Sequence, residues 1–181
     1  LDRGIDIELA KRIAKHMEEQ GIDYLHVSVL SFPLPEARYP SVPPIYTRRP
    51  PLVELAAQIK SQVRVPVITV GGFGELEEVQ QALESGAADI VALGRALIAD
   101  PKLPNKWRYG GILRPCIRCN RCHTRIMEQT TIRCAVNPEA GREGEVLPPA
   151  SRVKRVAVVG GGPAGVMAAV TAAQRGHTVF L

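Results

Sequence analysis

The stretch VPVITVGGFGELEEVQQALESGAADIVALGRAL, residues 65–97, decides the fold of this chain. Residues 65–70 and 89–93 are largely apolar runs, each typical of a buried strand. Between them, apolar side chains recur at helical spacing, and Gly86 is placed to end the helix. Apolar strands that alternate with helices predict a parallel sheet covered by helices, which is an α/β fold.

The order of helix and strand begins before this stretch and returns after it. Residues 9–17 are typical of a helix, a strand is predicted at 24–30, and another helix is predicted to begin near Pro51. After the polar residues 142–154, a strand and the helix 164–175 are predicted. Three helix–strand units are well short of the roughly 250 residues of an eight-stranded barrel. We therefore expect an internal fragment of a longer protein.

Composition excludes several classes of protein. Hydrophobic residues make up 45% and charged residues 23%, as in ordinary soluble globular proteins. The net charge of +5 comes without a basic stripe interleaved with aromatics, which argues against nucleic acid as a partner. The uncharged run 156–173 contains four glycines and Pro163, which argues against a membrane span. All four cysteines fall between 116 and 134, which favours a reducing, cytoplasmic location over a disulfide framework.

The cysteines follow the spacing Cys116-x2-Cys119-x2-Cys122-x11-Cys134. Three thiolates two residues apart, with a fourth from a more distant turn, suit a four-iron four-sulfur (4Fe-4S) cluster. Tetrahedral zinc remains the alternative, although structural zinc sites usually draw ligands from two separated pairs, whereas the first three cysteines are expected to form one tight loop. His123 could replace one cysteine, but its place directly beside Cys122 favours a solvated neighbour.

Two glycine turns follow successive predicted strands: VGGF at 70–73 and LGRAL at 93–97. Glycine allows backbone N–H groups to approach an anion closely, and such turns at barrel strands seven and eight commonly bind phosphate. The pair predicts a phosphate pocket in which Arg95 supplies a charge-assisted bond. A surface arginine at a helix start is the alternative for Arg95.

A third glycine turn, Gly160-x-Gly162-x-x-Gly165, lies between a predicted strand and a predicted helix. In this context the glycines permit a tight turn, close approach to a pyrophosphate and close packing of the helix, so the turn predicts nucleotide binding. The acidic residue that would contact the ribose is expected just after Leu181.

Four segments carry a family resemblance: ADIVALGRALIADPKLPNK, CIRCNRC, CAVNP and VAVVGGGPAG. Together they resemble the iron-sulfur flavoprotein oxidoreductases related to 2,4-dienoyl-CoA reductase, enoate reductase and trimethylamine dehydrogenase, over essentially the whole chain. The resemblance implies four parts. These are the C-terminal part of an FMN-binding TIM barrel of the old yellow enzyme type (1–112), a cluster segment (113–141), a linker (142–154) and the start of a Rossmann-like FAD/NAD(P)-binding domain (155–181).

The resemblance also implies cofactors and their residues. FMN would bind at the first two glycine turns, the cluster at the four cysteines, and the ADP half of FAD at the third glycine turn. The positions implied for FMN are Gly71, Gly72, Gly94 and Arg95, and those for FAD are Gly160, Gly162 and Gly165. NAD(P)H would reduce FAD, and electrons would pass through the cluster to FMN.

The substrate loop departs from the family pattern. In LPEARYP, residues 34–40, Pro35 stands where the dienoyl-CoA reductase branch has a histidine, while Glu36 and Arg38 match as candidate substrate-loop residues. Proline carries no proton to donate, so the catalytic acid is not identified. Tyr39 and Tyr46 lie in the same loop region and could face the flavin.

The implied reaction is NAD(P)H-dependent reduction of an activated C=C bond of the enoate or dienoyl-CoA type. Oxidation of an amine, as in trimethylamine dehydrogenase, is the alternative within the family. A small metal-binding or electron-transfer module without enzymatic activity is the alternative of another class. We expect a small-molecule substrate as the partner, with neither nucleic acid nor membrane, and the sequence leaves a homo-oligomer open.

Overall fold

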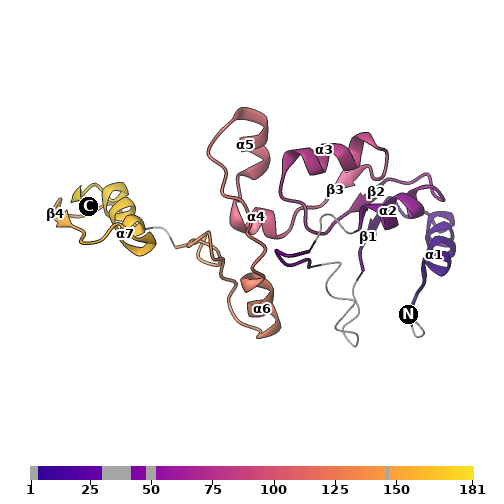
Figure 1. The fold of residues 1–181 in the computed structure, drawn as a ribbon, viewed down its shortest axis with the longest axis horizontal. Helices are drawn as coiled ribbons and strands as arrows, with labels where there is room; N and C mark the ends of the chain where they lie inside the picture. Colours follow the sequence, from indigo (N-terminus) through magenta and orange to yellow (C-terminus); the bar gives the residue numbers. More distant parts are fainter. Residues whose placement is uncertain (1–3, 30–41, 48–51, 146) are drawn as a thin grey trace. The chain divides into compact units, whose positions relative to one another are not determined.

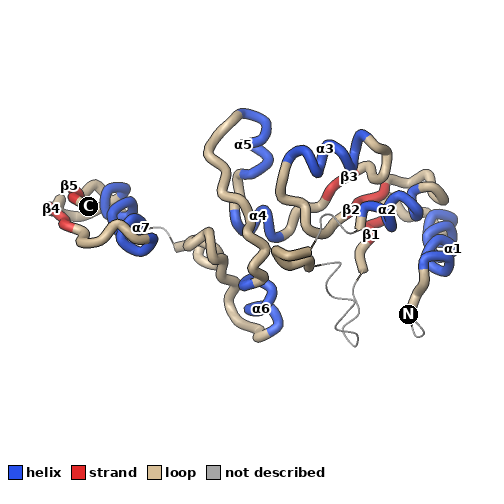
Figure 2. Tube along the Cα trace, viewed as in Figure 1, coloured by secondary structure: helices blue, strands red, loops and turns tan. Residues whose placement is uncertain are grey.

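The computed structural model describes residues 4–29, 42–47, 52–145 and 147–181. Glu36 and Arg38, with Pro35 and Tyr39, lie outside these described residues. The chain divides into two compact units, Leu1–Gly141 and Arg142–Leu181. Figure 1 traces the elements of each unit along the chain, and Figure 2 separates its helices from its strands.

A three-stranded parallel sheet organises the larger unit. Its strands are β1 (Leu25–Val27), β2 (Val67–Thr69) and β3 (Ile90–Val91), in the order β1-β2-β3. In the register, Leu25 lies opposite Val67, and Ile68 lies opposite Ile90. The parallel pairing confirms the α/β fold predicted from the sequence.

Three helices accompany this sheet: α1 (Ile7–Glu19), α2 (Val53–Lys60) and α3 (Leu76–Glu84). Helix α2 packs against β1 and β2, α3 packs against β3, and α1 packs against α2 (Figure 1). The core lies under α2, where Leu52, Ala56 and Val67 are almost fully buried. Burial of these apolar side chains holds the central strand in place.

Local signals explain where α1 begins and where it is attached. The Asp6 side chain accepts a hydrogen bond from the Leu9 N–H (2.7 Å), which satisfies one of the free donors at the start of the helix. Near its end, the Glu18 carboxylate accepts from the N–H groups of Arg64 (2.6 Å) and Val65 (2.9 Å). These two backbone bonds lower the pKa of Glu18 and attach α1 to the chain entering β2.

The strands are shorter than the apolar runs that predicted them. The run 65–70 forms a strand only over Val67–Thr69. Pro66 has no N–H to donate to a neighbouring strand, and at Gly71 the backbone turns to a left-handed φ of 109°. The apolar run is therefore interrupted at both ends by backbone chemistry, although its side chains remain apolar.

Three further helices follow β3: α4 (Arg95–Ala99), α5 (Leu103–Tyr109) and α6 (Arg121–Met127). The expectation that the first three cysteines form a single loop is wrong, because Cys122 lies in the first turn of α6. Asn120 makes the turn into α6 with a left-handed φ of 58°. Asparagine adopts this conformation more readily than most residues, so the loop ends one residue before Arg121.

The smaller unit is one strand–helix–strand motif. Strands β4 (Arg155–Ala157) and β5 (Thr178–Phe180) are parallel neighbours, and α7 (Pro163–Gln174) connects them. The element order agrees with the prediction from the sequence. Among the described residues, no helix is long and apolar enough to cross a membrane.

Candidate functional site

A cavity of about 240 Å³ lies at the carboxyl ends of β2 and β3. The carboxyl ends of parallel strands meet at one edge of a sheet, which is where ligands bind in α/β proteins. Both predicted phosphate turns line this cavity. Part of the cysteine run, residues 116–122, lines it as well. The lining includes Gly71, Gly72, Gly94, Arg95, Cys116, Arg118, Cys122 and His123.

The first glycine turn has the backbone conformation that its sequence predicted. Gly71 and Gly72 have φ values of 109° and 83°, a left-handed region that other residues rarely occupy. Side chains at these positions would be strained, so the turn depends on glycine. Gly94 of the second turn has a φ of −101° and is the residue from which α4 begins.

Arg95 is half-buried and bonded to the protein. Its Nη1 donates to the carbonyl oxygen of Pro43 (2.8 Å) and to Oδ1 of Asn120. Arg95 is the first residue of α4, as the alternative expected, but two protein oxygens hold its guanidinium beside the cavity. Its role as a phosphate ligand stays a prediction. A guanidinium carries five N–H donors, so these bonds are compatible with contact to a phosphate.

The cysteine run is attached to residues 42–47 by two side chains. Arg118 is buried, and it donates to the carbonyl oxygens of Ile45 (2.8 Å) and Thr47 (3.0 Å). Asn120 donates from Nδ2 to the carbonyl oxygen of Val42 (3.1 Å). These bonds span more than 70 residues of sequence and place the cysteine run against the segment that follows β1. In that segment Tyr46 is 80% exposed.

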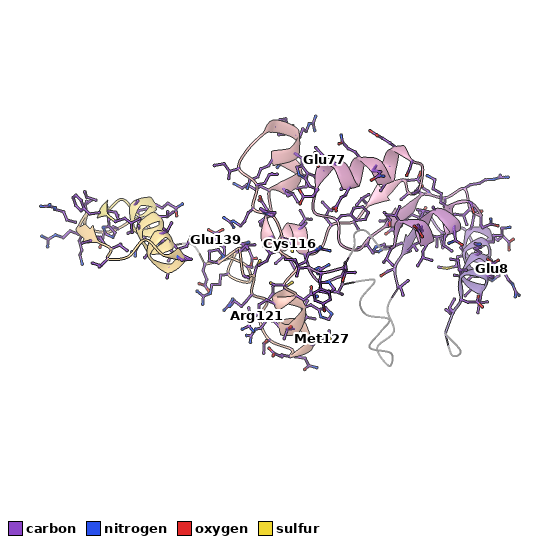
Figure 3. All side chains as sticks on the ribbon, viewed as in Figure 1. Glu8, Glu77, Cys116, Arg121, Met127 and Glu139 are labelled. Atoms are coloured by element: carbon purple, nitrogen blue, oxygen red, sulfur yellow. The ribbon has the colours of Figure 1, made fainter. Side chains whose placement is uncertain are left out.

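The four thiols differ in their surroundings, and none forms a disulfide. Cys122 is buried, Cys116 and Cys134 are half-buried, and Cys119 is exposed. The Arg118 N–H donates to Sγ of Cys116 (3.4 Å), as N–H groups do to the sulfurs around iron-sulfur clusters. Figure 3 labels Cys116 with Arg121 and Met127, the two ends of α6, in the same part of the larger unit.

The pKa of the Cys122 thiol depends on burial and on the charges of two other thiols. Burial raises the pKa of the Cys122 thiol, and the nearby Cys116 and Cys134 thiols raise it further, while the His123 N–H and Arg95 oppose this. Within the described part of the chain, no three His, Cys, Asp or Glu side chains gather closely enough to hold a single metal ion. The assignment of all four cysteines as ligands stays a prediction.

A second asparagine fixes the turn that carries Cys134. Asn137 is 1% exposed, and its Nδ2 donates to the carbonyl oxygen of Ile98 (2.8 Å) in α4. Its Oδ1 accepts from Arg114 Nη1 (2.8 Å) and from the Glu139 N–H (3.1 Å). The cysteine segment is thus bonded to α4 by Asn120 near the start of the helix and by Asn137 near its end.

Sequence reasoning found the glycine turns, Arg95 and the cysteines but missed the residues that join them. Arg118, Asn120 and Asn137 lie inside the segments that carried the resemblance, yet no role was assigned to them. One signal was available for Asn120, because asparagine outside a strand or helix often marks a left-handed turn.

The third glycine turn lies in the smaller unit. A Cβ atom at Gly165 would overlap the carbonyl oxygen of Gly160, so the first turn of α7 passes directly against the glycine loop. Gly160 has a left-handed φ of 111°, and Pro163 is the first residue of α7. Tight turn, close helix packing and a helix that begins at the loop are the features expected of a pyrophosphate-binding turn.

A model of the NADH:flavin oxidoreductase / NADH oxidase family matches residues 3–112. The chain belongs to this family. An NADH oxidase from Thermoanaerobacter brockii is 44% identical over 100% of this chain and 28% of its own length. A cinnamate reductase from Clostridium sporogenes is 40% identical over 99% of this chain and 27% of its own length.

Solved structures of this family share the fold. Histamine dehydrogenase from Rhizobium sp. 4-9 matches with a TM-score of 0.76 and 28% identity, over 95% of this chain and 25% of that one. The chain spans 22% to 28% of the length of the first three curated relatives it matches. The similarity therefore concerns only this part of such proteins.

Proposed function

We propose that this chain is part of an NAD(P)H-dependent flavin and iron-sulfur oxidoreductase that reduces an activated C=C bond of the enoate type. In this proposal residues 1–112 are the C-terminal part of an FMN-binding TIM barrel, and residues 155–181 open a Rossmann-like FAD domain. The observation that carries the proposal is the shared cavity, which is lined by both phosphate turns and by Cys116 and Cys122. A flavin carries two electrons and an iron-sulfur cluster carries one at a time. Transfer of electrons between them requires that their sites lie close together.

The residues around the cavity fit FMN. The left-handed glycines at 71 and 72 present backbone without side chains, and Arg95 supplies a positive charge held by Pro43 and Asn120. These are the groups that bind a phosphate dianion. When bound, FMN supplies hydride chemistry, and the protein's own contribution is to hold the phosphate and exclude water from the cavity.

The cysteine segment fits an iron-sulfur cluster. It has four thiols, none of which forms a disulfide, and the Arg118 N–H donates a hydrogen bond to Sγ of Cys116. Burial raises the pKa of Cys122, so metal binding would have to displace its proton. When bound, a 4Fe-4S cluster carries single electrons, and burial and hydrogen bonds to the sulfurs tune its potential.

In the smaller unit, the Gly160 to Gly165 turn is proposed to bind the pyrophosphate of FAD. The tight contact between Gly165 and the Gly160 carbonyl supports this proposal, because only glycine lets the helix start so close to the loop. The carrier set of the complete protein is then FMN, the cluster, FAD and NAD(P)H.

Oxidation of an amine is a second candidate, and the similarity to histamine dehydrogenase favours it. Both reactions would use the same cavity, and the substrate-binding half of the complete barrel would distinguish them. A binding module without enzymatic activity is a third option, and it predicts a chain that takes up metal but no flavin.

The test uses the complete protein reconstituted anaerobically with FMN, FAD, iron and sulfide. We expect NADH or NADPH oxidation that depends on cinnamate or a similar enoate. Oxidation of histamine or dimethylamine with an artificial electron acceptor, without enoate reduction, would instead assign the amine reaction. Uptake of zinc with no flavin and no reducible cluster would refute both.

A variant of Arg95 tests the flavin assignment separately. Arg95→Gln should weaken FMN binding about 10- to 100-fold, because a charge-assisted bond to the phosphate is lost. Arg108→Gln, on the exposed side of α5, is the matched control and should bind FMN like the wild type. Equal FMN affinity in the two variants would remove Arg95 from the phosphate site.

A further inference from the structure

Asn120 lies between the second and third cysteines of the run, and its side chain bonds in two directions. Oδ1 accepts from Arg95, the proposed phosphate ligand, and Nδ2 donates to the Val42 carbonyl oxygen (3.1 Å). A carboxamide is suited to this because it carries an acceptor and a donor on one planar group. One side chain thus connects the cysteine run, the phosphate turn and the segment after β1.

The backbone of the run is held in a conformation that needs support. Arg118 and Asn120, on either side of Cys119, have left-handed φ values of 50° and 58°. This region is unfavourable for arginine, so the run must be held by contacts outside itself. Within the described residues, support comes from the bonds of Arg118 and Asn120 to residues 42–47 and from the bond to Arg95.

We propose that Asn120 couples occupancy of the cysteine site to binding of the FMN phosphate. Ligation of Cys119 and Cys122 would fix the run in its left-handed form, which presents Oδ1 of Asn120 to Arg95. Without ligated thiols the left-handed run depends on its protein contacts, so it relaxes more often, and Arg95 then keeps its bond to Pro43 but loses the bond to Asn120. The inference rests on the proposed function, because it requires both cofactors, and linkage makes the effect reciprocal.

The experiment compares the wild type and Asn120→Gly in the complete protein. Glycine keeps the left-handed backbone without strain and removes only the amide, so the change isolates the side chain. FMN is titrated anaerobically by quenching of its fluorescence, once with the cluster reconstituted and once without iron and sulfide. The wild type should bind FMN about tenfold more tightly with the cluster, the size of effect expected for a bond to a charged group.

Asn120→Gly should bind FMN about tenfold more weakly than the cluster-loaded wild type, and the cluster should no longer change its affinity. Riboflavin lacks the phosphate, so its affinity should be the same in both proteins. Asn105→Ala, at an exposed asparagine on α5, is the control and should behave as the wild type.

Each other outcome is decisive. FMN binding by the wild type, with unchanged affinity and cluster dependence in Asn120→Gly, overturns the coupling and leaves the proposed function standing. A wild type without cluster dependence, or a parallel loss of riboflavin binding in the variant, also overturns the coupling. No FMN binding by the reconstituted wild type overturns the proposed function as well.

If Asn120→Gly does not fold, Asn120→Asp decides. The carboxylate still accepts from Arg95 but places a negative charge beside the phosphate. FMN should then bind more weakly than to the wild type while riboflavin binds equally well. Equal affinity of this variant and the wild type for FMN would refute the role of Asn120.

Discussion

Replacing the buried Asn137 with alanine should loosen both the end of α4 and the turn that carries Cys134. The change removes three hydrogen bonds: to the Ile98 carbonyl, from the Glu139 N–H and from Arg114. Bonds to neutral backbone groups contribute about 1 kcal/mol each and a bond to a charged group about 2 kcal/mol. The free energy of local opening should therefore fall by about 4 kcal/mol, which is about a thousandfold in the opening equilibrium.

Hydrogen exchange followed by mass spectrometry on the complete protein measures this opening directly. Amides in 95–100 and 134–140 should exchange about a thousandfold faster in Asn137→Ala, while amides in α1 keep their wild-type rates. Asn105→Ala, at an exposed asparagine, is the matched control and should leave all rates unchanged. An increase below about tenfold in Asn137→Ala would refute the assignment of these three bonds as the attachment of the turn.

Two further predictions concern other parts of the chain. Gly165→Ala should weaken FAD binding at least about tenfold, because its Cβ would overlap the Gly160 carbonyl, whereas Gly144→Ala, outside the turn and with no heavy atom within 4 Å of its Cβ, should bind FAD normally in equilibrium titrations. Burial raises the pKa of Asp100, but the bond from Lys106 (2.6 Å) and backbone N–H donors outweigh burial and lower it overall. Because the pKa of Asp100 is lower in the folded state, its ionised carboxylate stabilises the fold above the usual Asp pKa of about 4. This stabilisation is lost as the pH falls through the pKa of the folded state. Protection factors of the α5 amides, which correct for the pH dependence of intrinsic exchange, should therefore fall below about pH 4 in the wild type, and this fall should be smaller in Asp100→Asn.

The order of helices and strands could be predicted because it depends on local pattern. Apolar spacing and glycine stops fix α1, α3 and α7 within a few residues of sequence. The same patterns overestimated the strands, because side-chain hydrophobicity does not report the missing N–H of Pro66 or the turn at Gly71. Helices α4 and α5 were not predicted from the sequence. Helix α6 was missed because a cysteine run was interpreted as a ligand loop, whereas the helix begins directly after the left-handed Asn120.

The candidate site was predictable in its parts and not in its assembly. The glycine turns and the cysteine spacing indicate what they could bind from residue type and spacing alone. The bonds from Arg118 to residues 45 and 47 join positions more than 70 apart, and no local pattern records such pairs. The place of the glycine turns and Arg95 at one cavity follows from sheet topology, whereas Cys116 and Cys122 reach it through the bonds of Arg118 and Asn120.

Asn120 and Asn137 both bond to α4, so the chain between them forms a loop whose two ends are attached to the same helix. Residues 129–131, at the far end of that loop from Asn120 and Asn137, are exposed. Insertions there should lengthen the chain between Cys122 and Cys134 while the two attachments to α4 stay in place. The same exposed tip offers a place to attach a fluorophore or spin label that reports on the cysteine segment from the surface.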